Sequence, residues 1–280
     1  MMNSMKALAK DTAIYGISSI VGKFLNFLLV PFFTRVLENT ADYGIVTNLY
    51  AWTALLLVIL TYGTETGFFR FANKEGYDVR SVYKTTFFTV FTTSVIFAVL
   101  CVVFQQPIAN GLGYADHSNF IAMMAITVAM DAFASIPFAY LRYQKRPIVF
   151  ASLKLLYVIL NIAFSILFMV ILKKHDVTYV FVSNILATTI QTLILIPFTL
   201  PKGGTYQWAA LKDILIYSFP LLVLGVTGIM NQTLDRILFT FLYPGADAQA
   251  QLGIYGACFK VAMVMMMFTQ AFRYAYEPFV

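Results

Sequence analysis

The sequence predicts an all-α protein whose helices cross a membrane. Of its 280 residues, 60% are hydrophobic and 11% are charged, whereas soluble domains carry about 25% charged residues. Apolar runs recur along the whole chain, and they reach the length of about 18 residues or more that a helix needs to cross a bilayer. The class predicted from composition and run length is therefore a polytopic helical membrane protein.

A degraded internal repeat divides these helices into two units. Lys10-Asp11 matches Lys212-Asp213, Thr34–Leu37 matches Asp235–Leu238, and Gly44-Ile45 matches Gly253-Ile254. A repeat of roughly two hundred residues indicates a duplicated bundle of membrane helices. We therefore expect a six-helix N-terminal lobe at 1–202, an interfacial linker at 203–213 and the start of a C-terminal lobe at 214–280, so that the chain is an incomplete form of a longer protein.

Each expected span is an apolar run between polar segments. The first two come from the repeated segment, the third begins at the end of the basic cluster at 74–84, and the fourth ends at the basic cluster at 142–146. The seventh and eighth copy the first two. The eight expected spans are 12–37, 43–68, 82–105, 119–141, 148–172, 177–200, 214–242 and 252–278.

Two connections stand out among the segments between the spans. The segment 106–118 contains no Lys or Arg, and we expect a loop that faces outward. The linker begins with Pro201, Gly203 and Gly204 and continues with Tyr206 and Trp208. We expect a short amphipathic helix here, lying on the cytoplasmic surface of the membrane.

The distribution of Lys and Arg predicts the orientation. Eleven of these residues fall on one side of the predicted spans and three on the other. Because cytoplasmic loops are enriched in Lys and Arg, the N-terminus is predicted to be cytoplasmic. The same bias accounts for the net charge of +6, and no basic stripe with interleaved aromatic residues indicates binding to nucleic acid.

Charged residues inside the spans are the first candidates for function. A charge at the middle of a bilayer costs roughly 2.5 to 3.5 kcal/mol on insertion scales, so each should face a cavity or a partner. The cations at such positions are Lys23, Lys154, Arg236, Lys260 and Arg273. The anions are Glu65, Asp131, Asp235 and Glu277.

Helical spacing groups polar residues into stripes on four spans, and we expect these stripes to line one wet interior. The alternative for Asn161, Asn184 and Gln191 is that they bond one helix to another. Beyond the five cations, the residues expected to contact an anionic ligand are Asn26, Asn161 and Asn231.

Two carboxylates are candidates for ion coupling. Asp131 is expected either to pair with Lys23 or to bind a coupling cation. Asp235 is the second candidate. Because the side chains of neighbours on a helix point about 100 degrees apart, Asp235 and Arg236 are expected not to form an ion pair with each other.

No sequence pattern indicates an enzyme. We find no phosphate-binding glycine loop, no nucleophile with a base nearby in sequence and no metal-ligand spacing. Cys101 and Cys258 both lie in apolar runs and suggest neither a disulfide framework nor a zinc site. We therefore expect neither a metal nor a cofactor.

The sequence resembles a known transporter family. The segments DTAIYGISSIVGKFLNFLLVPFFTRVL, DYGIVTNLYAW and TYGTETGFFRFANKE, the second-lobe opening DILIYSFPLLVLGVTGIMNQTLDRILF and the segment AFRYAYEPFV are similar to Wzx-type polysaccharide flippases of the MOP exporter superfamily. The resemblance implies a MATE-like arrangement of two six-helix bundles around a central cavity. It also implies translocation of a polyprenyl-diphosphate-linked oligosaccharide across the bacterial cytoplasmic membrane by alternating access.

The resemblance also bears on partners and on a coupling ion. The partners would be membrane lipid, the lipid-linked oligosaccharide, and a polysaccharide polymerase or glycosyltransferases; the coupling ion would be H⁺ or Na⁺. A first rival is a MATE-type multidrug exporter, for which acidic residues are expected in the first-lobe cavity. A second is a membrane scaffold of a polysaccharide assembly system, in which the polar stripes only bond helices together.

Overall fold

The computed structural model describes residues 21–22, 24–25, 27–243 and 245–276, and for residues 264 and 266–276 it describes the backbone alone. Within these ranges every regular element is a helix, which confirms the all-α prediction. The described residues from 21 to 36 are helical. The helices that follow are α2 (Thr40–Thr61), α3 (Thr64–Ala72), α4 (Val79–Val103), α5 (Gln105–Leu112), α6 (Ser118–Tyr143), α7 (Pro147–Ile166), α8 (Thr178–Thr199), α9 (Trp208–Leu242) and α10 (Ala248–Tyr276).

Among the described residues, six helical segments are long and apolar enough to cross a membrane. They are Thr40–Ala72, Val79–Val103, Ala115–Tyr143, Pro147–Ile171, Thr178–Thr199 and Trp208–Leu242. Much of their surface remains apolar and exposed, as on α4, where Val99 and Val103 face outward. Exposed apolar side chains on such helices suit contact with lipid.

The expected span 43–68 is a broken helix. Tyr62 and Gly63 both have positive φ values, of 34° and 70°, so the α2 ladder stops and α3 begins at Thr64. Glycine adopts this left-handed conformation without steric cost. The correction to the sequence prediction is therefore a joint inside the second span.

Two expected connections are also corrected by the structure. The segment 106–118 is not a plain loop, because α5 and a 3₁₀ turn at Ala115–His117 occupy most of it. The short interfacial helix is wrong as well: residues 208–213 belong to α9, which runs without interruption to Leu242. The residues WAALKD contain no helix breaker, so they extend the apolar run that follows.

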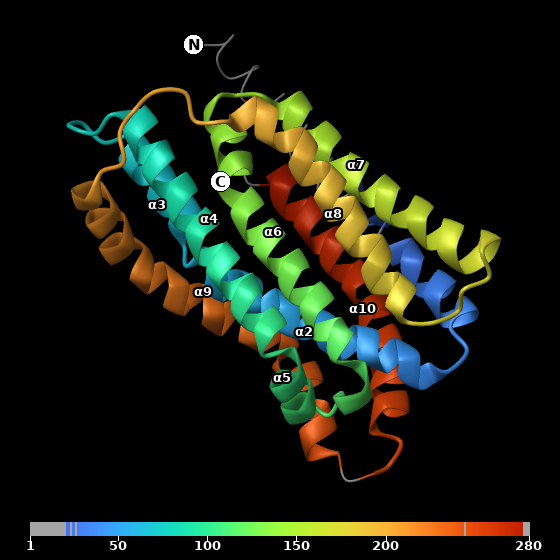
Figure 1. Cartoon of the computed structure of the whole chain (residues 1–280). Helices are drawn as coiled ribbons and strands as arrows, with labels where there is room; N and C mark the ends of the chain where they lie inside the picture. Colours follow the sequence, from blue (N-terminus) through green and yellow to red (C-terminus); the bar gives the residue numbers. More distant parts are fainter. Residues whose placement is uncertain (1–20, 23, 26, 244, 277–280) are drawn as a thin grey trace.

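The linker itself, before α9, is bonded to the first turns of α4. The Lys84 ammonium donates to the Gly204 carbonyl over 3.1 Å, and the backbone N–H groups of Thr205 and Gln207 donate to the hydroxyls of Ser81 and Thr85, each over 3.0 Å. Figure 1 shows the linker at one end of the molecule, with α5 and the α9–α10 connection at the opposite end. We call these the linker end and the α5 end.

The two repeats meet where α2 crosses α10. Gly44 and Gly253, which are equivalent in the repeat, lie so close that a Cβ on Gly44 would be 3.2 Å from the backbone nitrogen of Gly253. One turn further, Thr47 lies against Gly256, its equivalent in the repeat. Equivalent residues that touch each other place a pseudo-twofold axis at this crossing.

Candidate functional site

A cavity of about 280 Å³ lies between the first helix and helices α2, α7, α8 and α10. Its apolar wall contains Leu29, Val30, Phe33 and Val46. Its polar lining is formed by Tyr43, Tyr50, Tyr157, Asn161, Asn184 and Lys260. It therefore combines residues from both repeats.

Amide and phenol groups are held in place on the cavity wall. The Asn184 amide donates to the Tyr50 hydroxyl over 2.8 Å, and Thr188 donates to the Asn184 side-chain oxygen over 3.4 Å. Tyr157 also interacts with Asn184. These contacts fix three neighbouring polar groups whose remaining donors and acceptors are available to a ligand.

Lys260 supplies the charge of this cavity. It is half-buried on α10, one position after Phe259, and it lies close enough to Arg236 for the two cations to repel each other. A Lys ammonium carries three donors and no acceptor. The cavity is therefore suited to a ligand that has acceptor oxygens and negative charge.

A second group of charges lies between α6 and α7 of the first repeat. The Lys154 ammonium sits 4.1 Å from the centre of the Phe138 ring, and Asp131, two turns before Phe138 on the same face of α6, attracts it. Lys154 remains accessible to a water-sized molecule. Asp131 therefore has a cationic neighbour other than Lys23, which lies outside the described residues.

An ion pair joins this group to the linker end. The Arg142 guanidinium donates to the Glu65 carboxylate, and it also packs over the Phe69 ring at 5.1 Å. Both charges also act electrostatically on Lys154. In the sequence, Arg142 reads only as part of a basic loop cluster, although its place four residues after Phe138 on α6 could have indicated an inward face.

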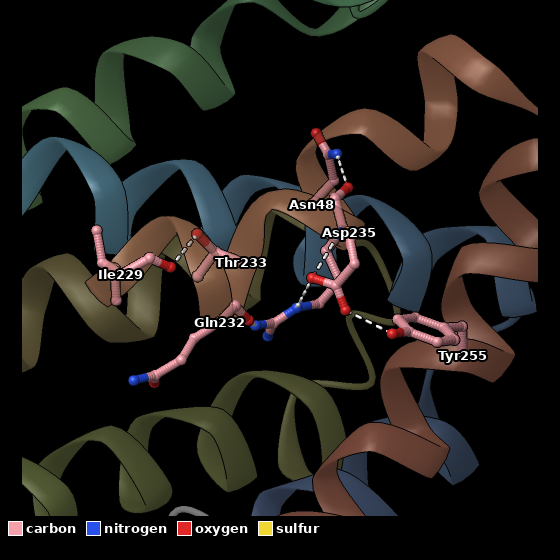
Figure 2. A network of polar contacts seen from close by, with 7 residues as sticks. Asn48, Ile229, Gln232, Thr233, Asp235 and Tyr255 are labelled. Atoms are coloured by element: carbon pink, nitrogen blue, oxygen red, sulfur yellow. Dashed lines mark hydrogen bonds and ion pairs between the residues drawn. The ribbon is translucent and has the colours of Figure 1, made fainter. Parts of the chain in front are cut away.

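Arg236 is engaged by its own helix and, through Asn48, by α2. Figure 2 shows Asn48 and Asp235 in this network. Its guanidinium donates to the Gln232 carbonyl, lies 3.5 Å from the Asp235 carboxylate and covers the Phe259 ring at 4.1 Å. Asp235 also accepts a hydrogen bond of 2.5 Å from the Tyr255 hydroxyl. The expectation that Asp235 and Arg236 would not pair is wrong, because the flexible Arg side chain folds back along α9.

The other predicted residues fall in three groups. Asn161 lines the cavity, whereas Gln191 donates to the Leu153 carbonyl over 2.9 Å and bonds α8 to α7. Asn231 is exposed on α9. Lys23 and Asn26 lie outside the described residues, and for Arg273 only the helical backbone is described.

Sequence reasoning missed the tyrosines at 43 and 50. Both lie on α2, where they stand among apolar residues and among the polar residues Asp42, Thr47 and Asn48. The role of the Tyr50 phenol becomes clear only once Asn184 of α8 is placed beside it. In the described part of the chain, no group of three or more His, Cys, Asp and Glu side chains could hold a metal ion.

Comparisons with known proteins agree with this architecture. A family described as "Polysaccharide biosynthesis protein" matches residues 8–274, and no curated protein matches the chain. The fold is similar to that of the MATE multidrug transporter DinF-BH, solved as a complex, with a TM-score of 0.72 and 15% identity. A solved chain described as "protein A" gives a TM-score of 0.74 and 16% identity.

The coverage of these matches is unequal. Both solved structures cover 98% of this chain, whereas this chain spans 64% of each of theirs. At such low identity the likeness shows the fold alone. It confirms the MATE-like arrangement of helices that the resemblance implied.

Proposed function

Since the chain belongs to the polysaccharide biosynthesis protein family, we propose that it serves as a membrane exporter that moves a polyprenyl-diphosphate-linked oligosaccharide between membrane leaflets. The observation that carries this proposal is the placement of Lys260 in a cavity lined by the side chains of Tyr50, Tyr157, Asn161 and Asn184. A diphosphate is anionic, and sugar hydroxyls exchange hydrogen bonds with amides and phenols.

The charge balance of the interior favours an anionic cargo. Among the described residues, Asp131 lies near Lys154, Glu65 pairs with Arg142 and Asp235 pairs with Arg236. In the part of the chain that the structure describes, the charge that acts on Lys260 is another cation, Arg236. The attraction between such a lysine and an anion is weakly screened inside a membrane protein.

A MATE-type exporter of cationic compounds is the second candidate, because Asp131 places a carboxylate in the interior of the first repeat. That carboxylate is attracted to Lys154, so a cation would have to compete with the lysine for it. A scaffold without transport would require a packed interior, and the cavity of about 280 Å³ supports transport instead.

Movement by alternating access is supported by the contact between the repeats. Repeat-built transporters place the substrate at the interface between the repeats and rock one against the other. The cavity is lined by α2 of the first repeat and by α10 of the second, beside the pseudo-twofold crossing of Gly44 and Gly253.

The test is to replace Lys260 by alanine in the cells that produce this protein. We expect less polysaccharide at the cell surface and accumulation of the lipid-linked oligosaccharide on the cytoplasmic side, at unchanged protein abundance. Lys260→Arg should be milder because it retains the charge. Lys212→Ala is the control, since Lys212 is exposed on α9 near the linker end.

Two outcomes would contradict the proposal. Normal polysaccharide export in the Lys260→Ala variant would show that the cavity is not the substrate site. Loss of efflux of a cationic dye in the Asp131→Asn variant, with normal polysaccharide export, would favour the multidrug exporter.

A further inference from the structure

At the α5 end, the contact between the repeats contains a chain of hydrogen bonds through Asn48, which has no polar equivalent in the other repeat. Asn48 on α2 donates to the backbone carbonyl of Arg236 on α9 over 2.7 Å, a contact drawn in Figure 2. The Tyr114 hydroxyl donates to the Asn48 side-chain oxygen over 3.0 Å. Gln249, in the first turn of α10, donates to the Tyr114 hydroxyl over 3.2 Å.

This chain of bonds crosses from one repeat to the other twice. Asn48 and Tyr114 belong to the first repeat, and the Arg236 carbonyl and Gln249 belong to the second. The repeat pairs Gly44 with Gly253, so Asn48 corresponds to Ala257, which has no polar side chain. The hydrogen bonds are therefore an addition on one side of the pseudo-twofold axis.

The polar groups concerned are buried. Asn48 is 1% exposed and Tyr114 is 4% exposed, so the loss of one partner leaves the others without water to replace it. Burial also raises the pKa of Tyr114 to about 12. The phenol therefore remains a hydrogen-bond donor throughout the physiological pH range.

The segment between α4 and α6 holds Tyr114 in position. α5 ends at Leu112, and the next residue, Gly113, turns the chain with a φ of 80°. The Tyr114 backbone N–H donates to the Ala109 carbonyl over 2.8 Å. Gln106 secures the following turn by donating to the Ala115 carbonyl over 2.9 Å. A helical segment that was expected to be a loop thus presents one side chain to the contact between the repeats.

We propose that Asn48, Tyr114 and Gln249 form a latch that closes the α5 end of the passage between the repeats and must open for the cargo to leave there. The latch rests on the proposed function, since an exporter that alternates between two openings needs a contact that breaks at each end in turn. Hydrogen bonds suit this role at an aqueous end, because water can replace them when the contact opens.

The close backbones of α2 and α10 make the latch sensitive to separation. A Cβ on Gly44 would lie 2.8 Å from the Gln249 carbonyl carbon, so the latch residue Gln249 sits at the tightest part of the crossing. A movement of this part of α10 away from the first repeat therefore lengthens the bond between Gln249 and Tyr114.

The test measures how easily the cavity is reached from the α5 end, which the charge count assigns to the outside. A reporter is introduced as Val46→Cys, because Val46 lines the cavity, after Cys101→Ala and Cys258→Ala remove the native thiols. A membrane-impermeant maleimide is then added outside intact cells. No cargo is needed for this measurement.

The variant Tyr114→Phe removes the hydroxyl and keeps the ring, and Asn48→Ala removes the bonds to Tyr114 and Arg236. We expect each to speed labelling about tenfold, since two hydrogen bonds are lost and each such bond in a membrane protein shifts an equilibrium by about threefold. Gln249→Ala, which loses one bond, should speed it about threefold.

The matched control is Thr53→Ala. Thr53 also lies on α2, but its hydroxyl bonds within the first repeat, to the Leu49 carbonyl over 2.9 Å. Its labelling should equal that of the parent protein. If Asn48→Ala lowers protein abundance, Tyr114→Phe decides the matter, because loss of a hydroxyl preserves the packing of the ring.

The outcomes separate the latch from the transport function. Unchanged labelling in Tyr114→Phe overturns the latch, even if Lys260→Ala abolishes polysaccharide export. Faster labelling together with normal export in Lys260→Ala supports the latch and overturns the proposed cargo.

Discussion

Replacing Gly44 by alanine should destabilise the protein by forcing α2 and α10 apart. The added Cβ would overlap the Gln249 carbonyl, with the carbonyl carbon at 2.8 Å and the Gly253 nitrogen at 3.2 Å. Since ordinary contacts of a Cβ begin at about 3.4 Å, and the Gln249 carbonyl oxygen lies even closer than the carbonyl carbon, the helices have to separate by more than about 0.6 Å. Overpacking of this kind typically costs about 1 to 3 kcal/mol.

The assay is thermal unfolding of the purified protein in detergent, compared with Gly228→Ala. Gly228 also lies within a long helix, α9, but a Cβ there meets nothing within 4 Å. Because alanine favours helix over glycine by up to about 1 kcal/mol, this control should match or exceed the parent protein in Tm. Equal Tm values for the two variants would refute the close crossing of α2 and α10.

Three further predictions concern topology, the interior charges and a helix cap. Cysteines introduced as Ser118→Cys and Asn73→Cys should react with impermeant reagents from opposite sides of the membrane, and labelling of both from one side would contradict the order of the spans. Asp131→Asn should lower the Tm by leaving Lys154 without its counter-charge, and adding Lys154→Met should restore most of the loss; a double variant no better than the single one would show that they do not interact. Asp78 caps α4, and hydrogen bonds from the Ser81 hydroxyl and backbone lower the pKa of its carboxyl, so its stabilisation is complete above the unfolded pKa of about 3.9 and is lost as pH falls through the lower folded value. The Tm difference between Asp78→Ala and the parent should therefore be constant near neutral pH and shrink in acid; a constant difference in acid would contradict this.

Hydropathy predicted most of the fold because membrane spans depend on little else. A span must form its own backbone hydrogen bonds and present apolar side chains to lipid. A long apolar run therefore folds as a helix. The break at Tyr62 and Gly63 escaped prediction because it lies just after an apolar run and carries no proline, and a single glycine is tolerated within a helix. The true start of α9 escaped it because Tyr206 and Trp208 are residue types that also anchor helices at the membrane surface.

The candidate site was less predictable, because it depends on which faces meet. Helical spacing placed Lys154, Asn161 and Asn184 on polar stripes, and the structure brings the stripes of α7 and α8 together. It gave no signal that Arg142 would reach Glu65, since these residues lie 77 positions apart. The pairing of Arg236 depended on side-chain length, which an argument from helical angles ignores.

The joint between α2 and α3 allows the two halves of this broken helix to move separately. A continuous helix of this length would act as a lever and transmit any tilt at one membrane face to the other. The left-handed residues Tyr62 and Gly63 interrupt the ladder instead, while the Ser218 hydroxyl donates to the Gly63 carbonyl over 3.3 Å and ties the joint to α9. α2, which crosses α10, can therefore change its tilt while α3, which holds Glu65 against Arg142, keeps its position. One end of the contact between the repeats can then open while the other stays closed.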